Sequence, residues 1–250
     1  MPPFRARAVL AVPLVLGSLA ASRPPSAELD PSLEVARAAA HPARSFASER
    51  ASFGVRFGGQ AVPYRVLAVT ALPGESVALS APDAMTLRYR GGSAVTTADG
   101  WSWTAPTTPG IVPLVIEGPG GAVRLNVLVL HPLAEQIGES LNGYRIGRYL
   151  AKPLRGSPAY FPPAGFVAVG PGDADVLVSP HLTLGQFPCK QPGDPRYLHL
   201  TAGLVLKLEA ILEAANAAGY EAPTFHVMSG FRTPAYNAAV GNEAVYSRPR

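Results

Sequence analysis

The residue most clearly placed to do chemistry is Arg232, which lies between an apolar stretch and the start of a helix. Residues 229–234 read Ser-Gly-Phe-Arg-Thr-Pro. The apolar residues 224–228 predict a buried strand, and Thr233-Pro234 predicts a helix start, because threonine caps helices and proline favours their first turn. A guanidinium beside the backbone N–H groups of a helix start would bind an anion. A structural ion pair between Arg232 and an acidic side chain is the open alternative.

Other residues that carry chemistry have no spacing typical of a site. No two of the five histidines have an i, i+4 or metal-type spacing, so we expect structural roles for them, His181 and His226 included. Asp173 and Asp175 would form either a carboxylate pair or a solvated turn. Cys189 is the single cysteine, which excludes a disulfide within the chain, and we interpret it as a small buried hydrophobe.

Three stretches together resemble one enzyme family. They are Ser-Pro-His-Leu-Thr-Leu-Gly-Gln-Phe at 179–187, a leucine-rich helix that ends near Asn216 and Gly219-Tyr220, and residues 226–241 around Arg232. Over about residues 135–248 the chain resembles the zinc D-alanyl-D-alanine carboxypeptidase and dipeptidase family, in its exported form with a C-terminal peptidase domain. The resemblance implies peptidoglycan stem peptides as partners. It also implies that Arg232 binds substrate and stabilises the negative charge of the transition state.

The same resemblance predicts zinc as the family's cofactor, but not a zinc site in this chain. The family continues with Ser-x-His-x-x-Gly-x-Ala-x-Asp, and Tyr246-Ser247-Arg248 matches its first residues, which makes Ser247 a substrate-binding residue by resemblance. Pro249 stands where the first zinc histidine is expected, and proline has no ligating side chain. We therefore interpret residues 173–250 as an α+β peptidase-like domain truncated before its zinc motif, with no tight zinc binding and no hydrolysis. The alternative is a non-catalytic cell-envelope protein that binds or has a structural role.

The expected helices and strands show where these motifs lie in the fold. Leu204, Leu208, Ile211 and Ala215 recur at helical spacing, and Val205 and Leu212 widen this apolar stripe. A helix is therefore expected over about 201–218, with Thr201 as its cap and Gly219 as its stop. Residues 176–178 predict a strand, and Ser179-Pro180 predicts the start of a short helix. Residues 132–172 are rich in glycine and proline and read as an irregular connector with short strands.

Residues 59–131 predict a β-sandwich. Apolar and polar residues alternate in short segments at 62–69, 76–80, 85–89, 101–103, 111–116 and 123–130, with Gly-rich or Pro-rich turns between them. This pattern resembles the immunoglobulin-like domains attached to exported bacterial enzymes, with a role in spacing or docking. The expected fold is therefore an all-β Ig-like sandwich followed by the incomplete peptidase-like domain.

The N-terminus predicts export. Arg5 and Arg7 precede a short apolar run that ends at small residues near position 22, which is the layout of a signal peptide over 1–22, and residues 23–58 read as a linker. The protein would then reside in the periplasm or cell envelope, with no membrane span unless the signal stays uncleaved.

Composition excludes two further classes of protein. With 48% hydrophobic residues the chain of 250 residues is not intrinsically disordered. Its net charge is +4, but residues 1–56 hold seven arginines against four acidic residues, a net of +3, which leaves +1 for the rest. Because no basic stripe with interleaved aromatic residues occurs, nucleic acid is not an expected partner.

Overall fold

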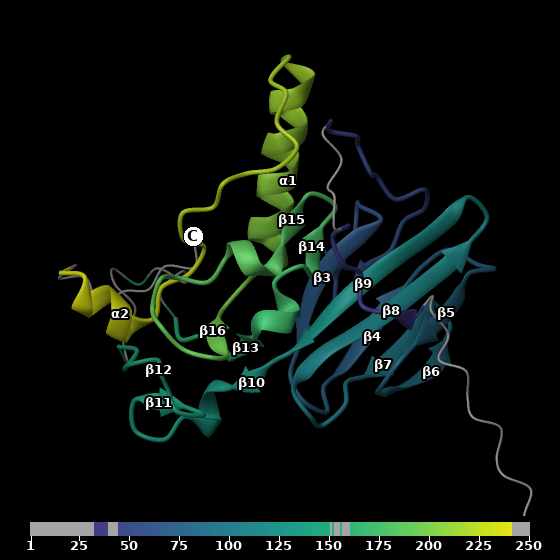
Figure 1. Ribbon diagram of the computed structural model, residues 1–250. Coiled ribbons are helices and arrows are strands. Elements are labelled where there is room, and N and C mark those ends of the chain that lie inside the picture. The colour runs from purple at the N-terminus through teal and green to yellow at the C-terminus, as the bar shows by residue number, and fades with distance from the viewer. Residues whose placement is uncertain (1–32, 40–44, 151, 153–155, 157–160, 242–250) are drawn as a thin grey trace, which may run out of the picture.

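The N-terminal half of the described chain forms two β-sheets (Figure 1). The computed structural model describes residues 33–39, 45–150, 152, 156 and 161–241. The five-stranded sheet has the order β2 (Gln60–Ala61), β1 (Arg56–Phe57), β4 (Ser76–Ser80), β7 (Gly100–Thr104), β6 (Ser93–Thr97). The four-stranded sheet has the order β3 (Val66–Ala71), β9 (Gly121–Val129), β8 (Gly110–Gly118), β5 (Thr86–Tyr89). Neighbouring strands are antiparallel except β3 and β9, which run parallel.

The alternation of apolar and polar residues along the strands explains why they form a sandwich. In β4 the side chains of Val77 and Leu79 are buried, whereas their neighbours are exposed or partly exposed, because successive residues of a strand point to opposite faces. Trp103 on β7 is completely buried in the same core. The predicted sheet-rich sandwich is thus confirmed. It begins earlier than expected, since β1 lies inside the stretch 23–58 that the sequence assigns to a linker, and it includes the exposed strand β6, which the sequence analysis did not predict.

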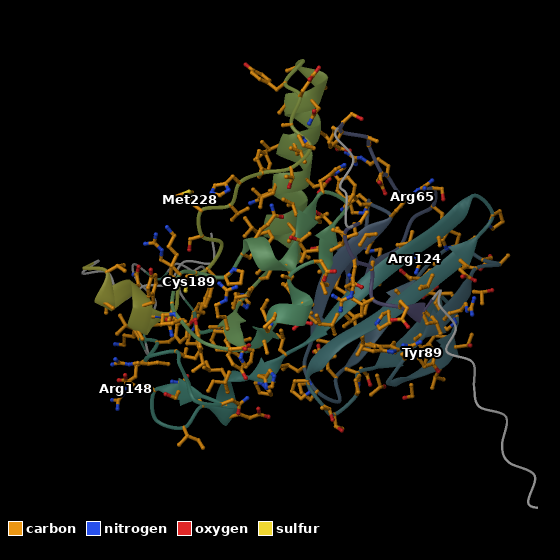
Figure 2. All side chains as sticks on the ribbon, in the orientation of Figure 1. Arg65, Tyr89, Arg124, Arg148, Cys189 and Met228 are labelled. Atoms are coloured by element: carbon orange, nitrogen blue, oxygen red, sulfur yellow. The ribbon has the colours of Figure 1, made fainter. Side chains whose placement is uncertain are left out.

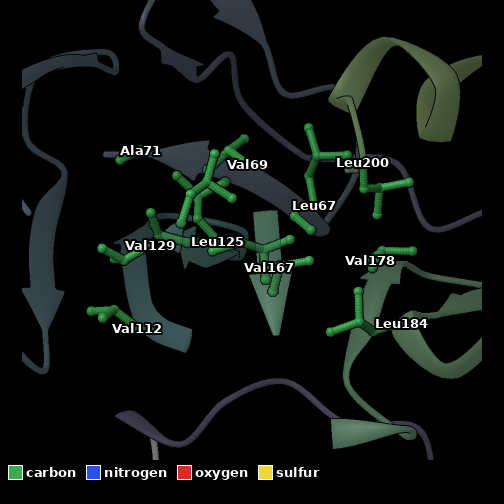
Figure 3. Packing of buried hydrophobic residues seen from close by; sticks show 14 of the residues in the cluster. Leu67, Val69, Ala71, Val112, Leu125, Val129, Val167, Val178, Leu184 and Leu200 are labelled. Atoms are coloured by element: carbon green, nitrogen blue, oxygen red, sulfur yellow. The ribbon is translucent and has the colours of Figure 1, made fainter. Parts of the chain in front are cut away.

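The C-terminal half covers the outer face of the four-stranded sheet. Strands β8 and β9 are buried on both faces over much of their length, so their sequences read as nearly continuous apolar runs. Strand β14 (Leu177–Ser179) and helix α1 (Ala202–Ala217) pack against β3. Figure 3 shows Leu67 and Leu125 of the sandwich packed in one cluster with Val167, Val178 and Leu200 of the later chain. The two halves therefore share a single hydrophobic core.

The remaining elements are short. A three-stranded sheet has the order β10 (His131–Pro132), β13 (Gly165–Val169), β16 (Arg196–Leu198), and two hairpins pair β11 (Ser140–Leu141) with β12 (Tyr144–Arg145) and β14 with β15 (Leu182–Thr183). Three 3₁₀ helices connect them, η2 (Leu133–Glu135), η5 (Pro171–Asp173) and η6 (Leu184–Gln186). The final described element is α2 (Pro234–Ala239).

Two local predictions are wrong. Ser179 does not cap a helix but ends β14, because the chain turns back at residues 180–181 and pairs as β15. Residues 224–228 form no strand, since irregular contacts take the place of ladder bonds there. The side-chain amide of Gln186 donates to the carbonyl of Phe225 at 2.7 Å, and the Thr224 hydroxyl donates to the carbonyl of His181 at 2.6 Å.

The long helix is confirmed with both of its ends. The Thr201 hydroxyl accepts from the N–H of Leu204 at 3.3 Å, and Gly219 follows the helix with φ +90°. The N–H of Tyr220 reaches back to the carbonyl of Ala215 at 3.0 Å, which is a Schellman closure. Val205 and Leu212 of the expected stripe are buried, whereas Ile211 is 56% exposed and the acidic Glu209 is buried in its place.

Candidate functional site

Arg232 lies on the surface directly before α2, and its two neighbours in sequence fix its backbone. Phe231 and Thr233 are buried, at 2% and 0% exposure, whereas the Arg232 side chain is exposed. The Thr233 hydroxyl donates to the side-chain oxygen of Gln191 at 2.6 Å. Figure 1 shows that α2 lies on the side of the molecule opposite the sandwich. An exposed guanidinium on an anchored backbone is suited to bind an anion from solution.

The backbone N–H groups in the first turn of α2 are not available to the predicted anion site. Proline 234 has no N–H. The N–H of Ala235 donates to the carbonyl of Ile146 at 3.0 Å, and the N–H of Tyr236 donates to the Thr233 hydroxyl at 3.0 Å. These amides are therefore used inside the protein, because Thr233 caps the helix and residues 146–147 pack against it. The predicted anion site, made of backbone amides and a guanidinium together, is therefore wrong. The guanidinium of Arg232 remains as the group that can bind an anion.

Two further arginines, Arg145 and Arg148, lie in a segment that Gln191 links to Thr233. Gln191, which accepts from Thr233, also donates to the backbone carbonyl of Arg145 at 2.8 Å. The guanidinium groups of Arg145 and Arg148 both lie within ion-pair distance of Glu139, at 3.2 and 3.5 Å, and both arginine side chains are more than two-thirds exposed. Arg148 is labelled at this edge of the molecule in Figure 2. Arg145 and Arg148 therefore share one carboxylate, that of Glu139, in a segment that Gln191 links to Thr233.

The described residues do not fit a zinc ion. No three histidine, cysteine or acidic side chains come together among them. His226 is exposed. Asp173 and Asp175, which the sequence left as either a carboxylate pair or a solvated turn, each have a separate partner. Asp173 accepts from the N–H of Gly170 at 3.0 Å, and Asp175 pairs with Arg37. Ser247 and Pro249, which the family resemblance singles out, lie outside the described residues, and we derive no step through zinc.

The sequence analysis missed a buried polar cluster around Glu209. This carboxylate is completely buried in α1, and the Ser179 hydroxyl, also completely buried, donates to it at 2.5 Å. The Nδ1 atom of His181 contacts its other oxygen. Because the Ser179 hydroxyl donates to a carboxylate rather than to an imidazole, the cluster does not activate it as a nucleophile. Ser179, His181 and Glu209 instead join β14 and the following turn to α1.

One helical turn later, Glu213 forms a second cluster. Its carboxylate accepts from Ser48 at 2.9 Å, from Tyr64 at 3.0 Å and from two nitrogens of Arg50. Burial raises the pKa of Glu213, but these donors outweigh burial and hold the pKa below its ordinary value. A groove of about 700 Å³ lies beside this cluster, between residues 45–50 and α1. Since donors already occupy both carboxylate oxygens, Glu213 has a structural role in the groove wall.

The Glu209 cluster had a partial signal in the sequence. Glu209 lies four residues after Val205 and three before Leu212, so it interrupts an apolar stripe of the helix, where an acid is buried only with partners. The partners of Glu209 could not be predicted from the sequence, because Ser179 and His181 lie about 30 positions earlier and reach it through the β14–β15 turn. Cys189 is buried as expected, with its sulfur 4.0 Å from the Tyr144 hydroxyl.

Comparison with known proteins gives no family for the chain. No protein-family model matches it, and neither does any curated protein or solved structure. Within the described residues, no helix has the length and apolar character needed to cross a membrane.

Proposed function

We propose that this chain is an exported cell-envelope protein that binds peptidoglycan stem peptides, with Arg232 receiving their terminal carboxylate. The observation that carries the proposal is the exposed guanidinium of Arg232 between two buried neighbours, Phe231 and Thr233. A guanidinium suits a carboxylate because its N–H groups match the two oxygens. Arg145 and Arg148, which share the single carboxylate of Glu139, would add a net positive charge that attracts an anionic ligand at long range.

The resemblance to zinc D-alanyl-D-alanine carboxypeptidases supports the choice of ligand. Of its three stretches, the sequence from Ser229 to Asn237, which includes Arg232, is the most specific. The signal-like N-terminus supports export. Hydrolysis in that family needs zinc, and the described residues provide no group of ligands for it. We therefore propose peptide binding, not cleavage, as the activity of the described region.

A second candidate is a non-catalytic structural protein of the envelope, built around an Ig-like sandwich. The observation that favours it is the shared core, since residues of the sandwich such as Leu67 pack in one cluster with Val178 and Leu200. A sandwich joined rigidly to the second half would serve as a spacer or docking module. In that case Arg232 would be dispensable for attachment to the envelope.

Calorimetry with a stem peptide ending in D-Ala-D-Ala, and with its C-terminal amide, separates these candidates. A charge-assisted hydrogen bond contributes about 1.5–3 kcal/mol, so we expect R232Q and the amide each to weaken binding at least about tenfold. R148Q removes an exposed arginine of the same surface and is the matched control, for which we expect less than about a threefold loss. Binding that is equal for R232Q and the unchanged protein would favour the structural candidate. Release of D-alanine after addition of zinc would replace the binding proposal with catalysis.

A further inference from the structure

Strand β6 forms an outer edge of the five-stranded sheet. It pairs with β7 on one side, and no strand of the described chain pairs with its other side. Four of its five residues are exposed, and Val95 at its centre is 69% exposed. Such an edge presents unpaired backbone N–H and C=O groups to solvent, where another strand can bind them.

The other three outer strands of the two sheets are protected against such pairing. Strand β2 has only two residues, and β14 and α1 pack against β3. Strand β5 carries Arg88, which forms an ion pair with Glu117 at 3.4 Å. Short length, a covering element and charge are the usual protections of a sheet edge. In contrast, β6 has five residues, Ser-Ala-Val-Thr-Thr, with neither a charge nor a proline, so it is the edge suited to pairing.

The hairpin with β7 decides which backbone groups of β6 point outward. Its register places Thr97 opposite Gly100 across a two-residue turn. Residues that flank such a turn can pair only through their own hydrogen bonds, and hydrogen-bonded pairs alternate with pairs that are not. Val95 therefore also bonds to β7, whereas Ala94 and Thr96 direct their N–H and C=O groups away from it. No described residue hydrogen-bonds to these outward groups.

The outward groups of β6 are complementary to those of a second β6. If two copies run antiparallel and are centred on Val95, Ala94 lies opposite the partner's Thr96, and Thr96 lies opposite the partner's Ala94. Each of these pairs can exchange both of its N–H···O bonds. Val95 then faces the partner's Val95 in a pair without hydrogen bonds, where side chains lie closest and β-branched residues pack well. This register pairs every outward group of the strand.

The charges at the two ends of β6 also favour an antiparallel copy. Arg90 precedes the strand, and Asp99 follows it in the turn to β7. Asp99 is exposed and forms no ion pair with any described residue, whereas Arg90 pairs with Glu34 at 3.0 Å and keeps 38% of its side chain exposed. An antiparallel arrangement brings the Asp99 end of each copy to the Arg90 end of the other. Opposite charges then meet at both ends, and the uncharged strand between them brings no like charges together.

We propose that two copies of this chain pair through β6 and join their five-stranded sheets into one, with a two-fold axis at Val95. Strand β6 and helix α2 lie at opposite ends of the molecule in Figure 1, so pairing leaves the Arg232 of both copies accessible and does not depend on the proposed binding there. A contact of one short strand is small beside the ~800 Å² per partner of a standard interface. We therefore expect a weak dimer, with a Kd on the order of 0.1 mM.

Sedimentation velocity on the full chain, between about 10 µM and 1 mM, tests the dimer. The average mass of the unchanged protein should rise from that of a monomer toward that of a dimer across this range. V95K places two lysines opposite each other at the two-fold axis, so the Kd should increase at least about tenfold. T86K adds the same charge at an exposed position of the edge strand β5, and the Kd should stay within about twofold. A chain that stays monomeric at the highest concentration, or a Kd that V95K leaves unchanged, would overturn the proposal.

Hydrogen exchange by NMR gives a second test that does not need any variant to fold. In the unchanged protein, protection of the Ala94 and Thr96 amides should rise at least about fivefold over the same range of concentration. The Val95 amide, which bonds to β7 in monomer and dimer alike, should change less than about twofold. Protection of Ala94 and Thr96 that is already present in the dilute monomer would show that another segment of the same chain occupies the edge, and it would overturn the proposal.

Discussion

Asn126 binds Ala36 as a neighbouring strand would. Its side-chain oxygen accepts from the N–H of Ala36 at 3.0 Å, and its side-chain nitrogen donates to the carbonyl of Ala36 at 2.9 Å. The same nitrogen donates to the carbonyl of Leu177 at 2.8 Å. Asn126 is 1% exposed in the middle of β9. One buried amide thus joins the sandwich, the N-terminal segment and β14.

The variant N126A should lower the free energy of unfolding by about 3 kcal/mol. It removes three hydrogen bonds and leaves the N–H of Ala36 and the carbonyl of Leu177 without this partner, whereas the carbonyl of Ala36 keeps the N–H of Leu177 at 2.9 Å. Each buried unsatisfied group costs about 1–3 kcal/mol. Urea unfolding measures the change. Q60A removes a side chain whose bond to Ala61 is exposed, and it should change stability by less than about 0.5 kcal/mol. Equal effects of the two variants would contradict a joining role for Asn126.

Ser179 offers a test of the buried cluster at Glu209. In S179A one oxygen of a completely buried carboxylate loses its donor, so we expect a loss of about 2 kcal/mol in urea unfolding. S48A removes a donor of similar chemistry from Glu213, but that bond is exposed and Arg50 and Tyr64 remain. It should therefore cost less than half as much. A smaller loss for S179A than for S48A would show that burial of Glu209 is not decisive.

The sequence predicted those parts of the fold that depend on local periodicity. The alternation around Val77 and Leu79 predicted a strand, and Thr201 with Gly219 predicted the ends of α1. Parts that depend on distant partners were not predictable. Residues 224–228 are apolar enough for a strand, yet Gln186 occupies the carbonyl of Phe225, and no local pattern announces that contact.

The same contrast between local patterns and distant contacts applies to the candidate site. The exposed position of Arg232 before a helix was predictable, because Thr233-Pro234 is a strong local signal for a helix start. The loss of the backbone amides was not, since it depends on the carbonyl of Ile146, almost 90 residues earlier. Likewise, an acid in an apolar stripe marks Glu209 as unusual, but only the fold brings His181 to it.

Two glycines at the ends of α1 should respond to alanine with opposite signs. Gly219 has φ +90°, a conformation that alanine adopts only with strain, so G219A should destabilise the protein by about 1 kcal/mol. Gly203 lies inside the helix with open space around its Cα, so G203A should stabilise by up to about 1 kcal/mol through helix propensity. Thermal unfolding measures both. Shifts of the same sign would contradict this description of the helix ends.

Alkaline pH should weaken the protein through Tyr64. Burial, together with the hydrogen bond to Glu213, raises the pKa of its phenol to about 12, whereas a free tyrosine titrates near 10. Between these values the unfolded chain loses the proton and the folded protein keeps it. The unfolded state then binds fewer protons, so stability falls as the pH rises, by about 2 kcal/mol between pH 10 and 12. Urea unfolding across this range should show a steeper decline for the unchanged protein than for Y64F. Parallel curves would mean that the Tyr64 phenol titrates in the folded protein as it does in the unfolded chain.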